Sequence, residues 1–173
     1  MAMKVFTVTD GAAAADVNEY MVNTKYAAKP SGTIRSNTAT TAIDPDLQLQ
    51  VDTNKSYMIE VFLLFNSSVT ANFKYRFNAP AGAVLYGSVL AYYVGGTGPG
   101  ITGYHTAGSN AVLYNTPQSI AGQDPFNSPV RISGVLNTAG TGGGFSVAWS
   151  QDTSNGFSTQ LLSGSFMLVR RVA

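Results

Sequence analysis

The feature that most constrains this fold is residues 57–66, Tyr-Met-Ile-Glu-Val-Phe-Leu-Leu-Phe-Asn. This stretch is almost entirely apolar and rich in β-branched and aromatic residues. A run of this kind is typical of a β-strand that is covered on both of its faces. We therefore expect residues 57–66 to lie at the centre of the fold.

The stretch that follows, residues 72–78, alternates strictly between apolar and polar side chains. Phe73, Tyr75 and Phe77 would share one face of a strand, and Lys74 and Arg76 the other. The intervening residues 67–70, Ser-Ser-Val-Thr, are short and polar, which favours an antiparallel turn. Together the two stretches predict a β-hairpin over residues 57–78.

The rest of the chain is a succession of short strand-like segments that are not interleaved with helices. Turn signals recur about every 8–12 residues, a spacing typical of sandwiches and jelly rolls. We predict an all-β fold, an antiparallel β-sandwich of jelly-roll type. Besides the hairpin, the expected strands are 33–42, 47–51, 83–94, 111–114, 130–138, 144–151 and 163–172, and the expected connecting segments are 26–31, 44–46, 95–108 and 115–129.

The N-terminal region differs from the β-rich remainder. Residues 4–9 read as an extended arm or short strand, and residues 12–22 are alanine-rich and predict a helix that Asp10 could cap. Val17, Tyr20 and Met21 form a narrow apolar stripe at helical spacing. We predict that residues 1–30 form an anchor and residues 31–173 a single domain. Four residues are expected to anchor it: Phe6, Val17, Tyr20 and Met21.

Charge is scarce along the whole chain. Charged residues make up 11% of the 173 residues, against about 25% in a typical protein. A surface so poor in charge favours burial against other subunits in an assembly. The net charge is +1 and Arg170-Arg171 is the one basic doublet, which argues against nucleic acid or an acidic membrane as a partner. We see no signal peptide and expect synthesis in a host cytoplasm.

Catalytic and metal chemistry finds little support in the residues. The chain has no cysteine and one histidine, His105, in a glycine-rich stretch without a nucleophile motif. Asp44, Asp46 and Asp52 match no calcium-loop signature and read as turn residues. We expect no enzyme activity, no cofactor and no metal site, although a hydrolase that uses carboxylates alone stays an open alternative.

Glu60 is unusual because it lies inside the most apolar stretch. It is expected either to pair across the hairpin with Lys74 or Arg76 or to lie at a subunit interface. We assign Glu60, Phe62, Lys74 and Arg76 to a predicted subunit interface.

Several tyrosines lie near the predicted loops. Exposed tyrosines can stack on sugars or anchor an interface, whereas half-buried core positions are the structural alternative for these residues, Tyr86 among them. We assign four of them to a partner-facing loop: Tyr92, Tyr93, Tyr104 and Tyr114.

Three pieces of the chain resemble short bacteriophage virion proteins of the tail-fibre-like and head-decoration-like kinds. The first is Asp10-Gly11 followed by residues 14–20, Ala-Ala-Asp-Val-Asn-Glu-Tyr. The second comprises residues 44–47, 54–57 and 59–60. The third comprises residues 147–151, 162–166 and 169–172. Residues 87–129 match nothing in that family.

This resemblance implies a small jelly-roll sandwich that forms a homotrimer in the virion and carries no enzyme activity. Capsid decoration or a head fibre attached to the major capsid protein by the N-terminal arm is the leading expectation. A tail fibre or receptor-binding knob attached to tail proteins is the alternative within the family. A jelly-roll module that binds carbohydrate is the alternative from a different class of protein.

Overall fold

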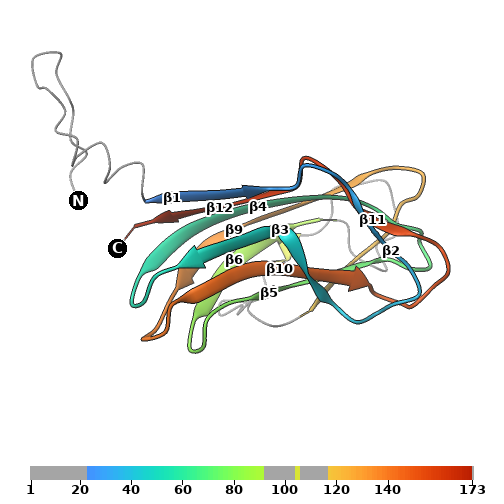
Figure 1. Cartoon of the computed structure of the whole chain (residues 1–173). Coiled ribbons are helices and arrows are strands. Elements are labelled where there is room, and N and C mark those ends of the chain that lie inside the picture. Colours follow the sequence, from blue (N-terminus) through green and yellow to red (C-terminus); the bar gives the residue numbers. More distant parts are fainter. Residues whose placement is uncertain (1–22, 92–103, 106–116, 173) are drawn as a thin grey trace, which may run out of the picture.

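The computed structural model describes residues 23–91, 104–105 and 117–172. These residues form two antiparallel β-sheets that pack face to face (Figure 1). The strands are β1 (Thr24–Ala28), β2 (Thr33–Arg35), β3 (Ala42–Val51), β4 (Ser56–Asn66), β5 (Phe73–Asn78), β6 (Val84–Leu90), β7 (Tyr104–His105), β8 (Gln118–Ile120), β9 (Ser128–Asn137), β10 (Gly143–Gln151), β11 (Thr159–Leu161) and β12 (Phe166–Arg171).

The order of the strands is that of a jelly roll. The larger sheet runs β1-β12-β4-β9-β6-β7, with the short β11 joining β2 to β4, and the smaller sheet runs β3-β10-β5-β8. When β2, β6, β7 and β11 are set aside, each sheet keeps four strands, and the chain alternates between the sheets as two Greek keys do. The predicted all-β antiparallel sandwich of jelly-roll type is therefore confirmed for the described residues.

The core lies between the sheets and is built by alternation along each strand. On β4 the fully buried positions are Tyr57, Ile59, Val61, Leu63 and Phe65, each separated by an outward-facing neighbour. Aromatic rings stack within the core: Phe65 and Phe73 face each other from opposite sheets at a centroid distance of 4.4 Å, and Phe73 and Trp149 of the smaller sheet lie 5.8 Å apart. Such pairs stabilise a core beyond the area that they bury, by about 0.5–1.5 kcal/mol each.

The hairpin predicted over residues 57–78 is wrong, because β4 and β5 belong to different sheets. β4 is paired with β9 and β12, and β5 with β8 and β10. The link after β4 instead carries the chain across the core, so that Phe65 and Phe73 face each other from opposite sheets. Alternation correctly placed Phe73, Tyr75 and Phe77 inward. The same alternation is expected whether the two strands pair in one sheet as a hairpin or lie in opposite sheets joined by an arch, so it could not distinguish the two.

All four predicted connecting segments contain strand: β7 lies within 95–108 and β8 within 115–129, and the other two overlap β1 and β3. Residues 26–31 were expected to connect, but β1 forms the edge of the larger sheet, with Thr24 opposite Arg170 and Ala28 opposite Phe166. Residues 24–29 therefore belong to the sandwich. The predicted turn at residues 44–46 is a bulge within β3, where the register shifts opposite Val147. Pro45 has no N–H to give to the ladder, which suits a bulge.

The N-terminal arm and helix predicted over residues 4–22 lie outside the described residues, as does the strand predicted at 111–114. The strand predicted over 33–42 is split, because β2 ends at Arg35 and β3 begins at Ala42. The predicted strands at 47–51, 83–94, 130–138, 144–151 and 163–172 correspond to parts of β3, β6, β9, β10 and β12.

Candidate interaction surface

The outer face of the larger sheet is apolar, although no described element packs on it. Outward positions of β4 alternate with its core positions, and three of them are the apolar Met58, Phe62 and Leu64. Register places further apolar side chains beside them, on β1, β6, β9 and β12. We define the outer apolar face as Tyr26, Met58, Phe62, Leu64, Tyr86, Leu90, Val135, Phe166 and Leu168.

Several of these side chains are substantially open to solvent. Tyr26 is 60% exposed, Met58 47%, Tyr86 44% and Val135 40%. Three of the rings on the face stack: the ring of Phe166 lies 5.9 Å from those of both Tyr26 and Phe62. An antiparallel sheet that faces water normally carries polar residues at such positions. A face with this many exposed apolar side chains is typical of an interaction site.

One ion pair crosses the middle of this face. Arg131 Nη2 on β9 donates to Glu60 Oε1 on β4 at 2.9 Å, and both side chains remain accessible. Glu60 therefore does not pair with Lys74 or Arg76, as the hairpin had suggested, because those residues lie on the opposite side of the sandwich. Lys74 Nζ instead lies 3.9 Å from Asp152 Oδ1.

The predicted interface residues thus fall on two separate surfaces. Glu60 and Phe62 belong to the outer apolar face, and Lys74 and Arg76 belong to the outer face of the smaller sheet. That second surface is polar: the described positions beside them include Gln48, Gln50, Asn78, Ser119 and Ser146. The structure does not bring the four residues together into one patch.

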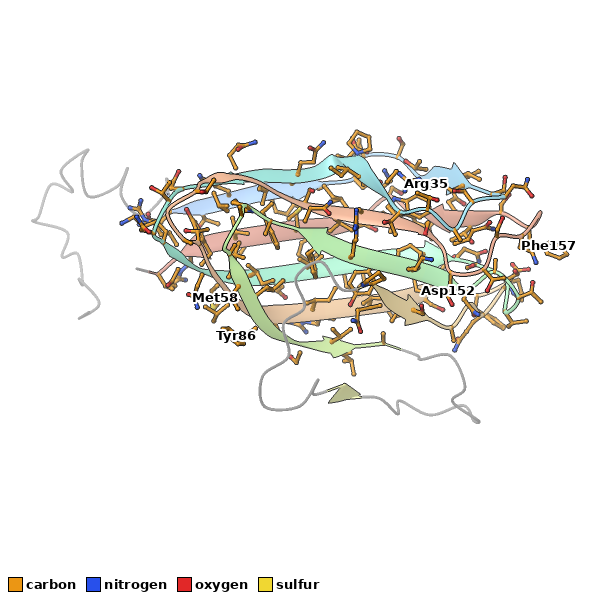
Figure 2. All side chains as sticks on the ribbon, turned by 90° about the horizontal axis from the view of Figure 1, so that it is seen from below. Arg35, Met58, Tyr86, Asp152 and Phe157 are labelled. Carbon is orange, nitrogen blue, oxygen red and sulfur yellow. The ribbon has the colours of Figure 1, made fainter. Side chains whose placement is uncertain are left out.

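A shallow hollow of about 380 Å³ lies in the outer apolar face. Gly134 on β9, which stands opposite Gly87 on β6, is one of the residues that line it. A Cβ at position 134 would lie 2.1 Å from the Tyr86 carbonyl oxygen, so the strands tolerate only glycine here. The residues that line the hollow include the apolar Met58, Val135 and Leu168 and the polar Glu60, Arg131 and Ser133. Figure 2 shows Met58 and Tyr86 near each other at one end of the sandwich.

A second polar arrangement, unforeseen from the sequence, is buried between β1 and β3. Lys29 Nζ donates to Asp44 Oδ2 at 2.9 Å and to Asp46 Oδ2 at 3.0 Å, and the side chains of Lys29 and Asp44 are fully buried. Trp149 Nε1 donates to the same Asp44 oxygen at 3.0 Å. The ammonium thus lies between the two carboxylates. Asp44 is a buried structural residue, and the prediction that it is a turn residue is wrong.

Arg35 on β2 extends this arrangement. Its guanidinium lies 4.1 Å from the centroid of the Trp149 ring, a cation–π geometry. It also donates to the carbonyl oxygens of Ala42 and Trp149. Burial lowers the pKa of Arg35, and the nearby Asp44 carboxylate opposes that shift. These contacts hold β2 against β3 and β10, so we assign the cluster to folding.

Most of the remaining predicted site residues lie outside the residues that the structure describes. Phe6, Val17, Tyr20, Met21, Tyr92, Tyr93 and Tyr114 are outside the described residues. Tyr104 and His105 make up strand β7 and pair with Leu90 and Val89 of β6. Tyr86, which the sequence left between core and interface, is exposed on the outer apolar face.

Among residues 23–91 and 117–172, no three His, Cys, Asp or Glu side chains cluster as metal ligands do. The described part of the chain contains no helix with the length and apolarity needed to cross a membrane.

Comparison with known proteins adds little to this picture. No family model matches the chain, and no curated protein matches it. Among solved structures, it is similar to "Structure of infectious bursal disease virus Gx strain", at 14% identity and a TM-score of 0.20 over 86% of this chain and 38% of that one. It is also similar to "Crystal structure of infectious bursal disease virus VP2 subviral particle", at 15% identity and a TM-score of 0.20 over 87% and 37% of the two chains. At that TM-score the likeness carries no argument about function.

Proposed function

We propose that this protein is a non-enzymatic structural component of a bacteriophage virion, a capsid decoration or head-fibre protein. The observation that carries the proposal is the outer apolar face, because a side of the sandwich that is built to be covered suits a protein that works within an assembly. Its attachment to the major capsid protein is assigned to the residues that precede β1.

Three further features support the proposal. The jelly roll is a fold that viral capsid proteins use, although lectin domains and cupins use it as well. The scarcity of charge, 11% of residues, suits a surface buried among subunits. The sequence pieces that resemble short phage virion proteins include residues 44–47 and 147–151, which meet at the buried Asp44–Trp149 hydrogen bond.

The test is co-sedimentation of the purified protein with tail-less capsids and, separately, with isolated tails of the parent virus, both from particles that lack this protein. We expect saturable binding to capsids and none to tails. A variant that lacks residues 1–22 is the matched probe, because β1 begins at Thr24 and every described strand pairing is retained. It should keep the melting temperature of the full chain and lose capsid binding.

The other outcomes are equally informative. Binding to tails alone would overturn capsid decoration in favour of a tail fibre or receptor-binding knob. Binding to neither would overturn the virion role and direct attention to a carbohydrate-binding module, which a glycan array can test with a Tyr86→Ala variant. Capsid binding by the shortened protein would contradict attachment through the N-terminal residues.

A further inference from the structure

We propose that the outer apolar face is the surface on which a second copy of this chain packs. This inference rests on the proposed assembly role and names the partner that covers the face. It also divides the four residues that the sequence assigned to a subunit interface: Glu60 and Phe62 belong to the contact, and Lys74 and Arg76 do not.

The charges on the face point to a copy of the same chain. The face carries one anion, Glu60, and two cations: Arg131, paired with Glu60 at 2.9 Å, and Arg170, which lies opposite Met58. A nucleic acid would require a larger surplus of positive charge than this one additional arginine supplies. A second copy brings the same ion pair, so each Arg131 can also meet the partner's Glu60, and neither charge of the pair is buried alone.

The relief of the face also complements itself. The hollow beside Gly134 is lined in part by exposed apolar side chains, among them Met58 and Val135, which are 47% and 40% exposed. A face that carries a hollow and a projection side by side can pack against a copy of itself, the projection of one entering the hollow of the other. Tyrosine and methionine are also enriched at the centres of protein interfaces.

The extent of the face is adequate for a stable contact. It spans β1, β12, β4, β9 and β6, and strand spacing and rise give these five strands a projected area of about 600 Å². Side-chain relief makes the accessible area larger than the projected one. Specific interfaces bury about 800 Å² on each partner, which is the same order.

The first test is the mass of the full-length protein in solution, by light scattering after size exclusion over a range of concentrations. We expect an oligomer that Met58→Glu combined with Val135→Glu reduces to a monomer with an unchanged melting temperature. Gln48→Glu combined with Gln50→Glu is the matched control, since both glutamines are exposed on the outer face of the smaller sheet, and it should leave the oligomer intact. A monomer at every concentration, or an oligomer that persists in the folded Met58/Val135 variant, would overturn the inference.

A second measurement holds even if the charged variants fail to fold. Because the chain has no cysteine, Met58→Cys and Gln48→Cys each introduce a unique thiol. We expect alkylation at position 58 to be several-fold slower than at position 48 in concentrated protein, and the difference to vanish on dilution to monomer. Equal rates at all concentrations would overturn the inference. An oligomer that fails to bind capsids would instead overturn the proposed function and leave this inference standing.

Discussion

Two regions reverse the usual rule that charged side chains are exposed and apolar ones buried. One is the buried polar cluster of Lys29, Asp44, Asp46 and Trp149 between β1 and β3, here called the seam, and the other is the outer apolar face of the larger sheet. At the seam, Lys29 and Asp44 are charged and yet 2% and 0% exposed. On the outer face, Tyr26 and Met58 are apolar and yet 60% and 47% exposed. Both arrangements cost free energy in an isolated chain unless something compensates for them.

The difference between the two regions lies in where the compensation comes from. At the seam it is internal, because the Asp44 carboxylate accepts hydrogen bonds from Lys29, from the Asp46 backbone and from Trp149. On the outer face no described residue supplies it. A satisfied polar cluster therefore indicates a structural role, whereas an uncovered apolar face indicates a partner. Substitutions at the seam should change folding, and substitutions on the face should change assembly.

The largest effect is expected from Asp44→Ala. This change leaves the buried Lys29 ammonium with Asp46 as its one carboxylate, and breaking a buried pair typically costs about 3–5 kcal/mol. Urea unfolding of the purified variant measures the loss. Lys25→Ala is the control, because its ion pair with Asp52 at 3.7 Å is solvent-exposed and should be worth less than about 1 kcal/mol. Equal losses in the two variants would refute the distinction between seam and surface.

Gly134→Ala should have the next largest effect. The new Cβ would meet the Tyr86 carbonyl oxygen, so β6 and β9 must separate, at a cost of about 1–3 kcal/mol. Because Gly134 lines the hollow, the displaced strands should also change the shape of the outer apolar face and weaken self-association. Gly140→Ala is the matched control, since nothing lies within 4 Å of its added Cβ. Denaturant midpoints and solution masses of both variants make the comparison.

Tyr57→Phe tests the hydroxyl group of Tyr57, near the start of β4. The Tyr57 hydroxyl donates to Asp52 Oδ2 at 3.0 Å and accepts from the Asp52 backbone N–H at 2.8 Å, which predicts a loss of about 1 kcal/mol. Burial raises the pKa of Tyr57 above its usual value of 10.0. Folding therefore favours the protonated phenol, and this contribution is present below pH 10 and is lost as the pH rises through the folded-state pKa.

Thermal unfolding between pH 9 and 11 would check this. The wild-type protein should lose stability more steeply than Tyr57→Phe over that interval. Parallel curves for the two proteins would show that another group is responsible.

The smallest effect is expected from the ion pair on the outer face. A double-mutant cycle with Glu60→Ala and Arg131→Ala should give a coupling of about 0.2–1 kcal/mol in the monomeric chain, as solvated pairs do. A parallel cycle with Glu60→Ala and Lys74→Ala should give none, because the two residues lie on opposite sides of the sandwich. A coupling between Glu60 and Lys74 would contradict the observed strand order and support the predicted β4–β5 hairpin.

The sequence predicts those parts of the fold that depend on neighbouring residues, and not those that depend on pairing between distant segments. The apolar run of β4 predicted a strand covered on both faces. One face is the core, but no described residue covers the other, which is the outer apolar face. Alternation, which is also a local signal, placed Phe73, Tyr75 and Phe77 inward. Whether β4 and β5 share a sheet is decided by their pairing with β9, β10 and β12, which lie far away along the chain.

The buried seam was unforeseen for a different reason. Asp44-Pro45-Asp46 has the composition of a turn, and Lys29 stands beside Pro30 as it would in a connecting loop. Nothing local to either segment shows that they meet, 15 residues apart, inside the sandwich. Trp149, the one tryptophan, offered the nearest signal, because a buried indole N–H requires an acceptor and Asp44 supplies it.

The pairing of β1 with β12 brings the two ends of the described chain together. Arg171 N–H donates to the Asn23 carbonyl oxygen at 2.7 Å, so a short flexible linker can join them without disturbing either strand. A circular permutant, closed there and reopened at the exposed Gly140, would keep every strand pairing of the sandwich while its new termini emerge between β9 and β10. Cargo fused to that permutant would then leave the molecule from a loop rather than from the edge of the larger sheet.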